Sequence, residues 1–303
     1  MGSPRAPVRL FHSLTLTATT MTEITPPEKT PAEKTLPEKT LAEIENEHWM
    51  AIESLRDIES DETWEHLGRL RKIASPAVVT KSLDWCSDPD PFRRSIGISV
   101  LAQLGSHGKL YPDEATSIIR QMVSTETDVE VLTSLISAVS FREVIDLIPW
   151  LVRLADHEAE DIRWRIAWAL PIRDPHDPHY EASIEVLLRL SRDAEPRVRD
   201  WATFSLATQI EEDSARIRDA LLARVDDADF DTRSEALVGL ARCRDPRGIQ
   251  PLIVALGSDR VGELAVEAAE AYADPQLQPA LLKLKKWWDI HPELLERAIA
   301  ACS

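Results

Sequence analysis

The sequence predicts an all-α solenoid, a stack of about six helical hairpins that follows a low-complexity tail. Three observations predict this fold: a short pattern recurs along the chain, each copy precedes a second amphipathic segment, and the composition favours helices. Only 9 of the 303 residues are glycine and 6% are aromatic, which argues against a turn-rich β architecture. Hydrophobic residues make up 44% of the chain, which is enough for a substantial core.

The first element that we predict is a disordered tail at residues 1–42. Between Pro26 and Ala42 the triplet Glu-Lys-Thr recurs at a spacing of five residues, which matches neither a helix nor a strand. A segment of Pro, Glu, Lys and Thr buries too little apolar surface to offset the entropy of ordering it. We therefore expect a solvated spacer. Met1 and Met21 both stay open as the true start, because the low-complexity segment begins cleanly at Met21.

Residues 43–87 form the second element, an N-terminal cap. We expect two or three helices here, near residues 46–59, 62–73 and 77–85, and none of them carries the recurring pattern. A solenoid needs an atypical terminal unit, because its last repeat would otherwise leave an apolar face uncovered.

Residues 88–303 carry the repeats and a C-terminal cap. The pattern is clearest in RVRDWATFSLA at residues 197–207: a branched residue, an arginine, two variable positions, a small apolar residue and a later leucine. Its copies are 29 to 39 residues apart, a spacing typical of repeat proteins. The copies begin at Phe92, Val131, Ile162, Val198, Thr232 and Val261.

Each copy is followed by a second amphipathic segment, so each repeat is a helical hairpin. Acidic residues and proline precede many of the first helices, where they cap backbone N–H groups. The second helices are expected at 113–123, 144–154, 180–190, 214–225, 247–256 and 275–284. After the last hairpin, either Trp287 or Trp288 is expected to lie over it and to close the stack.

Between residues 88 and 284 the chain resembles the HEAT-repeat family, in particular its short bacterial repeats. The stretches that carry the resemblance are VRDWATFSLA, TRSEALVGLARCRDPR and EAAEAYADPQLQPAL. The resemblance implies stacked hairpins with the first helices on the convex side and the second helices on the concave side. It does not imply one activity, because such repeats serve mostly as scaffolds.

The charge and the cysteines limit the classes of partner and ligand. The formal net charge is −17, and the charges of the tail nearly cancel, so the folded part is strongly acidic. Such a surface repels phosphate backbones, which makes nucleic acid an unexpected partner. The three cysteines lie far apart without a CxxC pair, as in a cytoplasmic protein with reduced thiols. We expect a monomer without metal, cofactor or membrane span.

No catalytic motif is present, so an enzyme is the alternative rather than the expectation. Deoxyhypusine hydroxylase, a HEAT-fold enzyme, holds iron with repeated His-Glu pairs, and here only His157-Glu158 is such a pair. DNA glycosylases with HEAT-like repeats expose Trp on a basic concave surface, which the nine Trp favour and the charge opposes. Phycobilin lyases share short repeats of this kind, but the sequence shows no motif for handling bilins.

Aromatic residues at outward positions of two consecutive first helices form the candidate binding site. Positions on the helix at 100° per residue place Val198, Ala202, Ser205 and Leu206 inward. The variable outward positions then hold three Trp and one Phe where a solenoid normally has polar residues. Packing between neighbouring helices is the competing interpretation for these aromatics. The candidate site residues are Trp164, Arg165, Trp168, Asp200, Trp201, Phe204 and Glu235.

The function that these observations favour is a non-catalytic scaffold or adaptor. A solenoid presents a long surface and no deep pocket of acid–base groups, so it suits binding of a protein or peptide better than chemistry. The alternative is a HEAT-fold enzyme of the phycobilin-lyase or DNA-glycosylase type. Titratable residues that converge in one concave cleft would distinguish the enzyme from the scaffold.

Overall fold

The structure, a computed structural model, describes residues 39–105 and 110–303, so the predicted tail lies outside it up to residue 38. Residues Leu41–Ser303 form one compact unit, and all regular elements in its described part are helices. The helices of its first half are α1 (Leu41–Leu55), α2 (Asp61–Ile73), α3 (Pro76–Cys86), α4 (Pro91–Ala102), α5 (Pro112–Met122), α6 (Val129–Phe141), α7 (Ile148–Leu154) and α8 (Glu160–Ala169).

The second half continues in the same way. Its helices are α9 (Tyr180–Leu190), α10 (Pro196–Phe204), α11 (Ala215–Leu222), α12 (Phe230–Arg242), α13 (Ile249–Leu256), α14 (Glu263–Tyr272), α15 (Gln278–Leu284) and α16 (Pro292–Ala301). Short 3-10 turns lead into three of the second helices, at Ile145–Leu147, Pro246–Gly248 and Pro275–Leu277. Helix α10 continues into a π-helical turn, Ser205–Gln209.

The predicted all-α solenoid is confirmed. Each recurring pattern forms a first helix, from α4 to α14 in even numbers, and each second segment forms its partner, from α5 to α15 in odd numbers. Helix α9 has the bounds that the sequence predicts. Helices α1 to α3 precede the repeats, and α1 begins at Leu41, inside the tail that we placed at residues 1–42.

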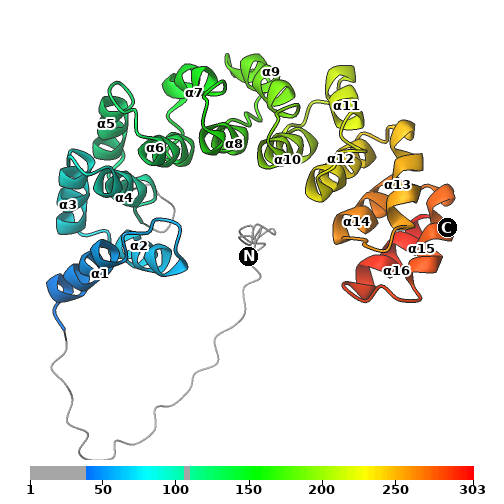
Figure 1. Cartoon of the computed structure of the whole chain (residues 1–303), viewed down its shortest axis with the longest axis horizontal. Helices are drawn as coiled ribbons and strands as arrows, with labels where there is room; N and C mark the ends of the chain where they lie inside the picture. The colour runs from blue at the N-terminus through cyan, green and yellow to red at the C-terminus, as the bar shows by residue number, and fades with distance from the viewer. Residues whose placement is uncertain (1–38, 106–109) are drawn as a thin grey trace, which may run out of the picture. The chain divides into compact units, whose positions relative to one another are not determined.

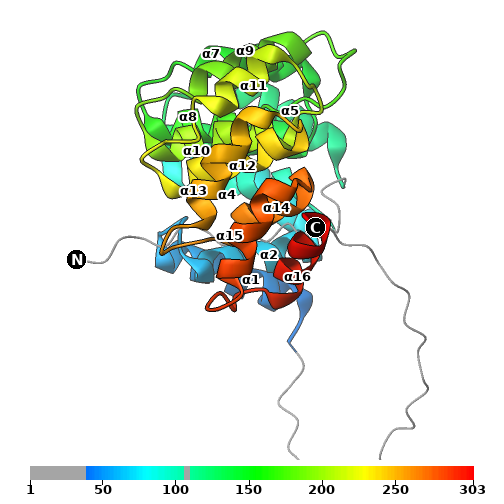
Figure 2. The ribbon, with the colours of Figure 1, turned by 90° about the vertical axis from the view of Figure 1, so that its right-hand side faces the viewer.

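Within this unit the helices stand in two curved rows (Figure 1). Helices α4, α6, α8, α10, α12 and α14 form the inner, concave row, and α5, α7, α9, α11 and α13 form the outer row. Figure 2 shows the same division, with α7, α9 and α11 above α8, α10 and α12. The arrangement that the family resemblance implied is therefore wrong for this chain, because the first helices line the concave side.

Small side chains let neighbouring helices pack closely. A Cβ atom on Gly239 of α12 would lie 2.7 Å from Leu221 Cδ1 and 2.8 Å from Ala207 Cβ, so only glycine fits at this crossing. In α10, Val198 and Ala202 are completely buried, as the helical periodicity predicts. The pattern of small and branched residues is therefore the packing surface of the inner row.

A ladder of arginines and carboxylates joins successive hairpins. Arg199 of α10 donates to the carbonyl oxygens of Asp193 and Ala194 in the loop before its helix. Its Nε and Nη2 also lie 2.9 and 2.8 Å from the carboxylate oxygens of Asp227 in the next such loop. Arg163 of α8 bonds the carboxylate of Asp193 in the same way, at 2.7 and 3.0 Å. The arginine of the pattern therefore fixes the spacing between repeats.

The first copy of the pattern has a different register from the one we predicted. Arg94 bonds the carbonyls of Asp88 and Pro89 and the carboxylate of Glu126, and so takes the place of the ladder arginine. We expected Arg93 in that place, so this copy begins one residue later. Two consecutive arginines in the sequence left the register ambiguous by one position.

Of the two tryptophans that the sequence offered for closing the C-terminal end, Trp288 is the one that packs on the stack. Trp288 is 4% exposed, and its Nε1 donates to the carbonyl of Val261 at 2.8 Å. Trp287 is 51% exposed and lies outside the packed end of the stack. In the ranges 39–105 and 110–303, no helix has the length and apolar character that crossing a bilayer requires.

Candidate functional site

Helices α8 and α10 are neighbours in the concave row, and equivalent positions on them carry the predicted site residues. We count positions from the residues that precede the helices, Ala159 for α8 and Glu195 for α10. Trp164 and Trp168 then stand at positions five and nine of α8, and Trp201 and Phe204 stand at positions six and nine of α10. The side chains at these positions contact one another and a few neighbours through ring stacking and cation–π contacts, and we call this set the aromatic patch. The aromatic patch consists of Phe141, Trp164, Arg165, Trp168, Arg197, Trp201 and Phe204.

Ring contacts link the aromatic members of the patch. The rings of Trp164 and Trp201 lie 6.0 Å apart at an interplanar angle of 32°, across the boundary between α8 and α10. Trp201 packs edge-on against Phe204 at 5.7 Å within α10. Trp168 packs edge-on against Phe141 at 5.5 Å, which extends the patch to the end of α6. Both edge-on distances are within the range of favourable aromatic pairs.

The aromatic residues differ in burial. Trp164 is only 6% exposed, and its Nε1 donates to a carboxylate oxygen of Asp161 at 3.2 Å. Trp168, Trp201 and Phe204 are half-buried. The packing interpretation therefore applies to Trp164, whereas the other three rings keep surface that faces away from the core.

Two arginines stack on the ring of Trp164. The guanidinium carbon of Arg165 lies 4.0 Å from the ring centroid, and that of Arg197 lies 3.8 Å from it. Arg165 also lies 5.7 Å from the centroid of Trp168. These are cation–π distances, so both cations stay beside the indole of Trp164.

The electrostatics of Arg165 are unusual for this acidic chain. Burial is the main cause that lowers the pKa of Arg165, to about 10, and the positive charge of Arg197 lowers it further. The guanidinium stays protonated at neutral pH. Its Nε atom is buried and has no hydrogen-bond partner. Asp161, the acid nearest to it on α8, pairs with Arg197 at 3.6 Å.

Two predicted residues lie outside the aromatic patch as we define it. Asp200 is half-buried on α10, and Glu235 on α12 is 1% exposed. The sequence argument missed Arg197 and Phe141. Arg197 is the second residue of α10, and the sequence argument assigned it no part in the site. Phe141 is the last residue of α6, where the repeat pattern is loosest.

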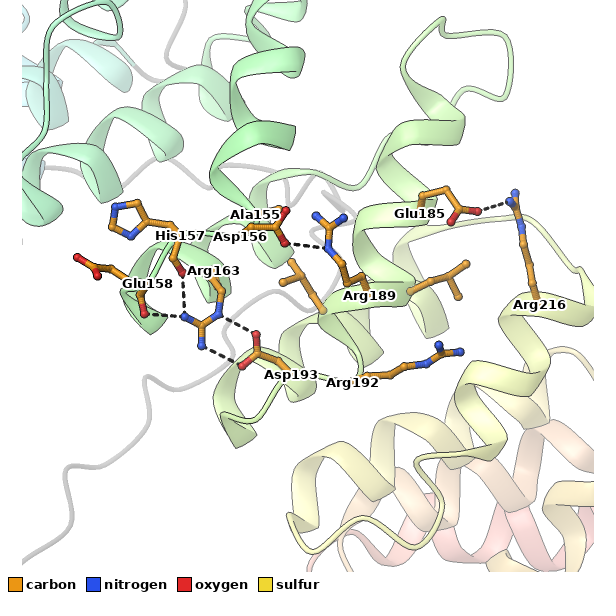
Figure 3. A pocket seen from close by; sticks show the side chains of 12 residues that line it. Ala155, Asp156, His157, Glu158, Arg163, Glu185, Arg189, Arg192, Asp193 and Arg216 are labelled. Carbon is orange, nitrogen blue, oxygen red and sulfur yellow. Dashed lines mark hydrogen bonds and ion pairs between the residues drawn. The ribbon is translucent and has the colours of Figure 1, made fainter.

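A second candidate is a hollow of about 800 Å³ beside the ends of α7 and α9 (Figure 3). Titratable side chains converge on it, as the enzyme alternative requires. It is lined by Ala155, Asp156, His157, Glu158, Arg163, Glu185, Leu188, Arg189, Leu190, Arg192, Asp193 and Arg216.

Several of the charged groups around this hollow bond to the loops or to one another. Arg163 and Asp193 belong to the arginine ladder, and Asp193 also accepts the backbone N–H of Glu195. Arg189 pairs with Asp156 at 3.1 Å, and the backbone N–H of Ala159 donates to Nδ1 of His157. These bonds tie Arg163, Asp193, Arg189, Asp156 and His157 to the loops of the solenoid.

Metal ligands and thiols do not gather elsewhere in the described chain. Within residues 39–105 and 110–303, no group of three or more His, Cys, Asp or Glu side chains is arranged to hold a metal ion. Cys86 and Cys302 are buried, and burial raises the pKa of the Cys86 thiol well above its ordinary value.

Comparison with known proteins shows the fold. No family model matches the sequence. Protein YibA of Escherichia coli strain K12 is 27% identical over 209 residues, which cover 67% of this chain and 72% of YibA. The crystal structure of Escherichia coli YibA superposes with a TM-score of 0.65 at 23% identity, and covers 91% of this chain and 98% of YibA.

Other solved structures superpose more loosely. Human deoxyhypusine hydroxylase in complex with glycerol gives a TM-score of 0.34 at 16% identity over 86% of this chain and 97% of the enzyme. A designed armadillo repeat protein gives 0.40 at 17% identity over 74% of this chain and all of the design. Neither likeness is close enough to bear on activity. The chain is a helical-repeat solenoid similar in fold to YibA.

Proposed function

We propose that this chain is a HEAT-type scaffold or adaptor without catalytic activity, which binds a protein or peptide partner on the concave side of α8 and α10. The observation that carries the proposal is the aromatic patch. Half-buried Trp168, Trp201 and Phe204 stand beside Arg165 and Arg197 on the inner row. Clusters of Trp and Arg are the side chains that dominate binding energy at protein interfaces.

The place of the patch supports the proposal. Repeat proteins use their concave surface to hold extended partners, because neighbouring repeats there present equivalent positions at a regular spacing. An aromatic ring keeps few rotatable bonds, so a partner that covers it loses little conformational entropy. The chain is proposed to act as a monomer in the cytoplasm, with nucleic acid disfavoured by the net charge of −17.

Affinity capture with the full chain as bait tests this proposal. Lysate of the native cells would be passed over the wild type, Trp168→Ala, Trp201→Ala and the control Trp287→Ala, and bound proteins would be quantified by mass spectrometry. Trp287 is an exposed Trp in the C-terminal cap, remote in sequence from the patch. We expect one partner to be lost from both patch variants and kept by the control.

The expected size of the effect is that of an aromatic residue which dominates the binding energy of an interface. Each patch variant is expected to bind the partner more weakly by roughly 2 kcal/mol, or about 30-fold in dissociation constant. Thermal unfolding of each bait checks that the variants remain folded. Equal capture by all four baits would show that the patch does not bind the partner. The scaffold is preferred to the enzyme alternative because Arg163, Asp193, Arg189 and Asp156 of the hollow already pair with one another or with the loops.

A further inference from the structure

Arg165 differs from the other arginines of the solenoid in its partners. Among the arginines of residues 39–105 and 110–303 that are not exposed, every other one has a hydrogen bond or an ion pair, and Arg165 has neither. Arg163, two residues earlier, shows the usual situation. Its guanidinium bonds both carboxylate oxygens of Asp193 and the carbonyls of His157 and Glu158. Arg165 instead has only the rings of Trp164 and Trp168 beside it.

An unpaired and partly desolvated guanidinium costs free energy, because the group has five N–H donors that were bonded to water in the unfolded chain. Stacking on Trp164 returns only part of that loss. Because Nε is buried, the part of the planar group left for a partner is its Nη1 and Nη2 end. Arginine holds a carboxylate through two parallel bonds in the plane of such an end. This end therefore has the geometry of a carboxylate receptor.

The local charge favours an anion, although the chain as a whole is acidic. Arg165 and Arg197 both stack on Trp164, and Asp161 is the acid that contacts this pair. Asp161 is already engaged, since it accepts the indole N–H of Trp164 and pairs with Arg197. These three groups carry a net positive charge, and Glu59 is a further acid whose charge acts on Arg165 without an ion pair.

We infer that the partner presents an acidic side chain, Asp or Glu within an apolar segment, and that its carboxylate pairs with Arg165 beside Arg197. This inference rests on the proposed function, since it names the chemistry of the partner at the same patch. The half-buried ring of Trp168 lies on α8 with Arg165, and that of Trp201 lies on the neighbouring α10. These two rings take the apolar side chains of the segment. The carboxylate then completes the bonding of a guanidinium that the fold leaves incomplete.

Selection from a displayed library of random dodecapeptides tests the inference without knowledge of the natural partner. The baits are the full chain, R165M, W201A and the control R153M. Methionine keeps the length and apolar stem of Arg165 and removes its charge. Arg153 on α7 is exposed and likewise has no ion pair, so it controls for loss of one positive charge. We expect the wild type and R153M to enrich Asp or Glu next to aromatic or aliphatic residues, and R165M to lose that enrichment.

The most enriched peptide and its Glu→Gln or Asp→Asn counterpart are then titrated against each bait by calorimetry. We expect the amide peptide to bind about 10- to 100-fold more weakly than the acidic peptide to the wild type and R153M, as for a charged hydrogen bond. With R165M the two peptides should bind within about 3-fold of each other, because the coupling requires both partners.

The outcomes separate the inference from the proposed function. Enriched peptides that depend on Trp201 but contain no acidic residue would overturn the acidic partner and leave the scaffold standing. If the change from the acidic to the amide peptide weakened binding to R165M as much as binding to the wild type, the acidic partner would also be overturned. If no selected peptide depends on Trp201, both proposals fail. Binding of a fluorescent oligothymidylate that is lost in R165M would replace the acidic segment by a nucleic acid.

Discussion

Trp164 and Trp201 are in contact, but they serve the molecule differently. Trp164 is 6% exposed, and the guanidinium groups of Arg165 and Arg197 stack on its ring. Trp201 keeps part of its ring exposed on the concave side. Burial of an aromatic side chain contributes to stability, whereas an exposed ring has surface to contribute to a complex.

Alanine substitutions should separate these two roles. We expect Trp164→Ala to lower the free energy of unfolding by about 3–5 kcal/mol, because it leaves a cavity and removes the indole N–H that donates to Asp161. Trp201→Ala is expected to cost less, about 1–2 kcal/mol, since only part of its ring is buried. Urea unfolding followed by circular dichroism measures both values. If Trp201→Ala were the more destabilising variant, Trp201 would be a core residue.

At the scale of the elements, the arginine ladder makes the stability of the stack depend on pH. Burial acts to raise the pKa of Asp227, but the hydrogen bonds from Arg199 and from the backbone of Asp229 outweigh it, and the pKa lies below its ordinary value. A carboxyl with a lowered pKa contributes stability above its unfolded pKa of roughly 4, and this contribution is lost as the pH falls through the folded pKa.

Asp227→Asn is therefore expected to lower the free energy of unfolding by about 3–5 kcal/mol at pH 7, because it leaves buried Arg199 without its counter-ion. The gap between wild type and variant should narrow as the pH falls below 4, where the wild type loses the same charge. Urea titrations at pH 7 and pH 3 measure the gap. Asp156→Asn, in an exposed ion pair, is the control and should cost less than about 1 kcal/mol. A gap that stays constant down to pH 3 would contradict the assigned role of the charge.

Helix ends provide a second test at this scale. Helix α14 ends at Tyr272, and the next residue, Ala273, has the left-handed backbone angles φ 51° and ψ 41° that favour glycine. We expect Ala273→Gly to raise the free energy of unfolding by about 0.5–1 kcal/mol. Ala271→Gly, at an exposed position inside the same helix, should lower it by about 0.5–1 kcal/mol. A loss in both variants would show that Ala273 is not strained.

Across the whole molecule, stability is expected to be local, because each hairpin packs only on its neighbours. Trp288 closes the C-terminal end: it is buried, and it satisfies the carbonyl of Val261. Trp288→Ala should therefore reduce hydrogen-exchange protection in α14 to α16 and leave α4 to α6 unchanged. Exchange followed by mass spectrometry resolves the two regions. Trp287→Ala is the control, and equal loss of protection at both ends would show that the solenoid unfolds as one unit.

The sequence determined the helices and their pairing into hairpins. Both depend on local signals, such as the spacing of apolar residues and the acids that precede α4 and α12 and accept backbone N–H groups at their starts. These signals act within one or two helical turns, so a linear pattern is enough to read them. The outward placement of Trp168, Trp201 and Phe204 is a prediction from the same periodicity, and Trp164, placed outward by the same argument, is 6% exposed.

Only the tertiary structure decided which row is concave and which charges meet there. The direction of curvature results from small rotations that accumulate between hairpins, and no single repeat encodes it. Arg197 reaches Trp164 across a helix boundary, and Phe141 reaches Trp168 from the preceding repeat. The π-helical turn after Phe204 packs against α12, where Ala207 lies close to Gly239. Contacts between residues about 30 positions apart depend on how repeats stack, and that packing is absent from the linear pattern.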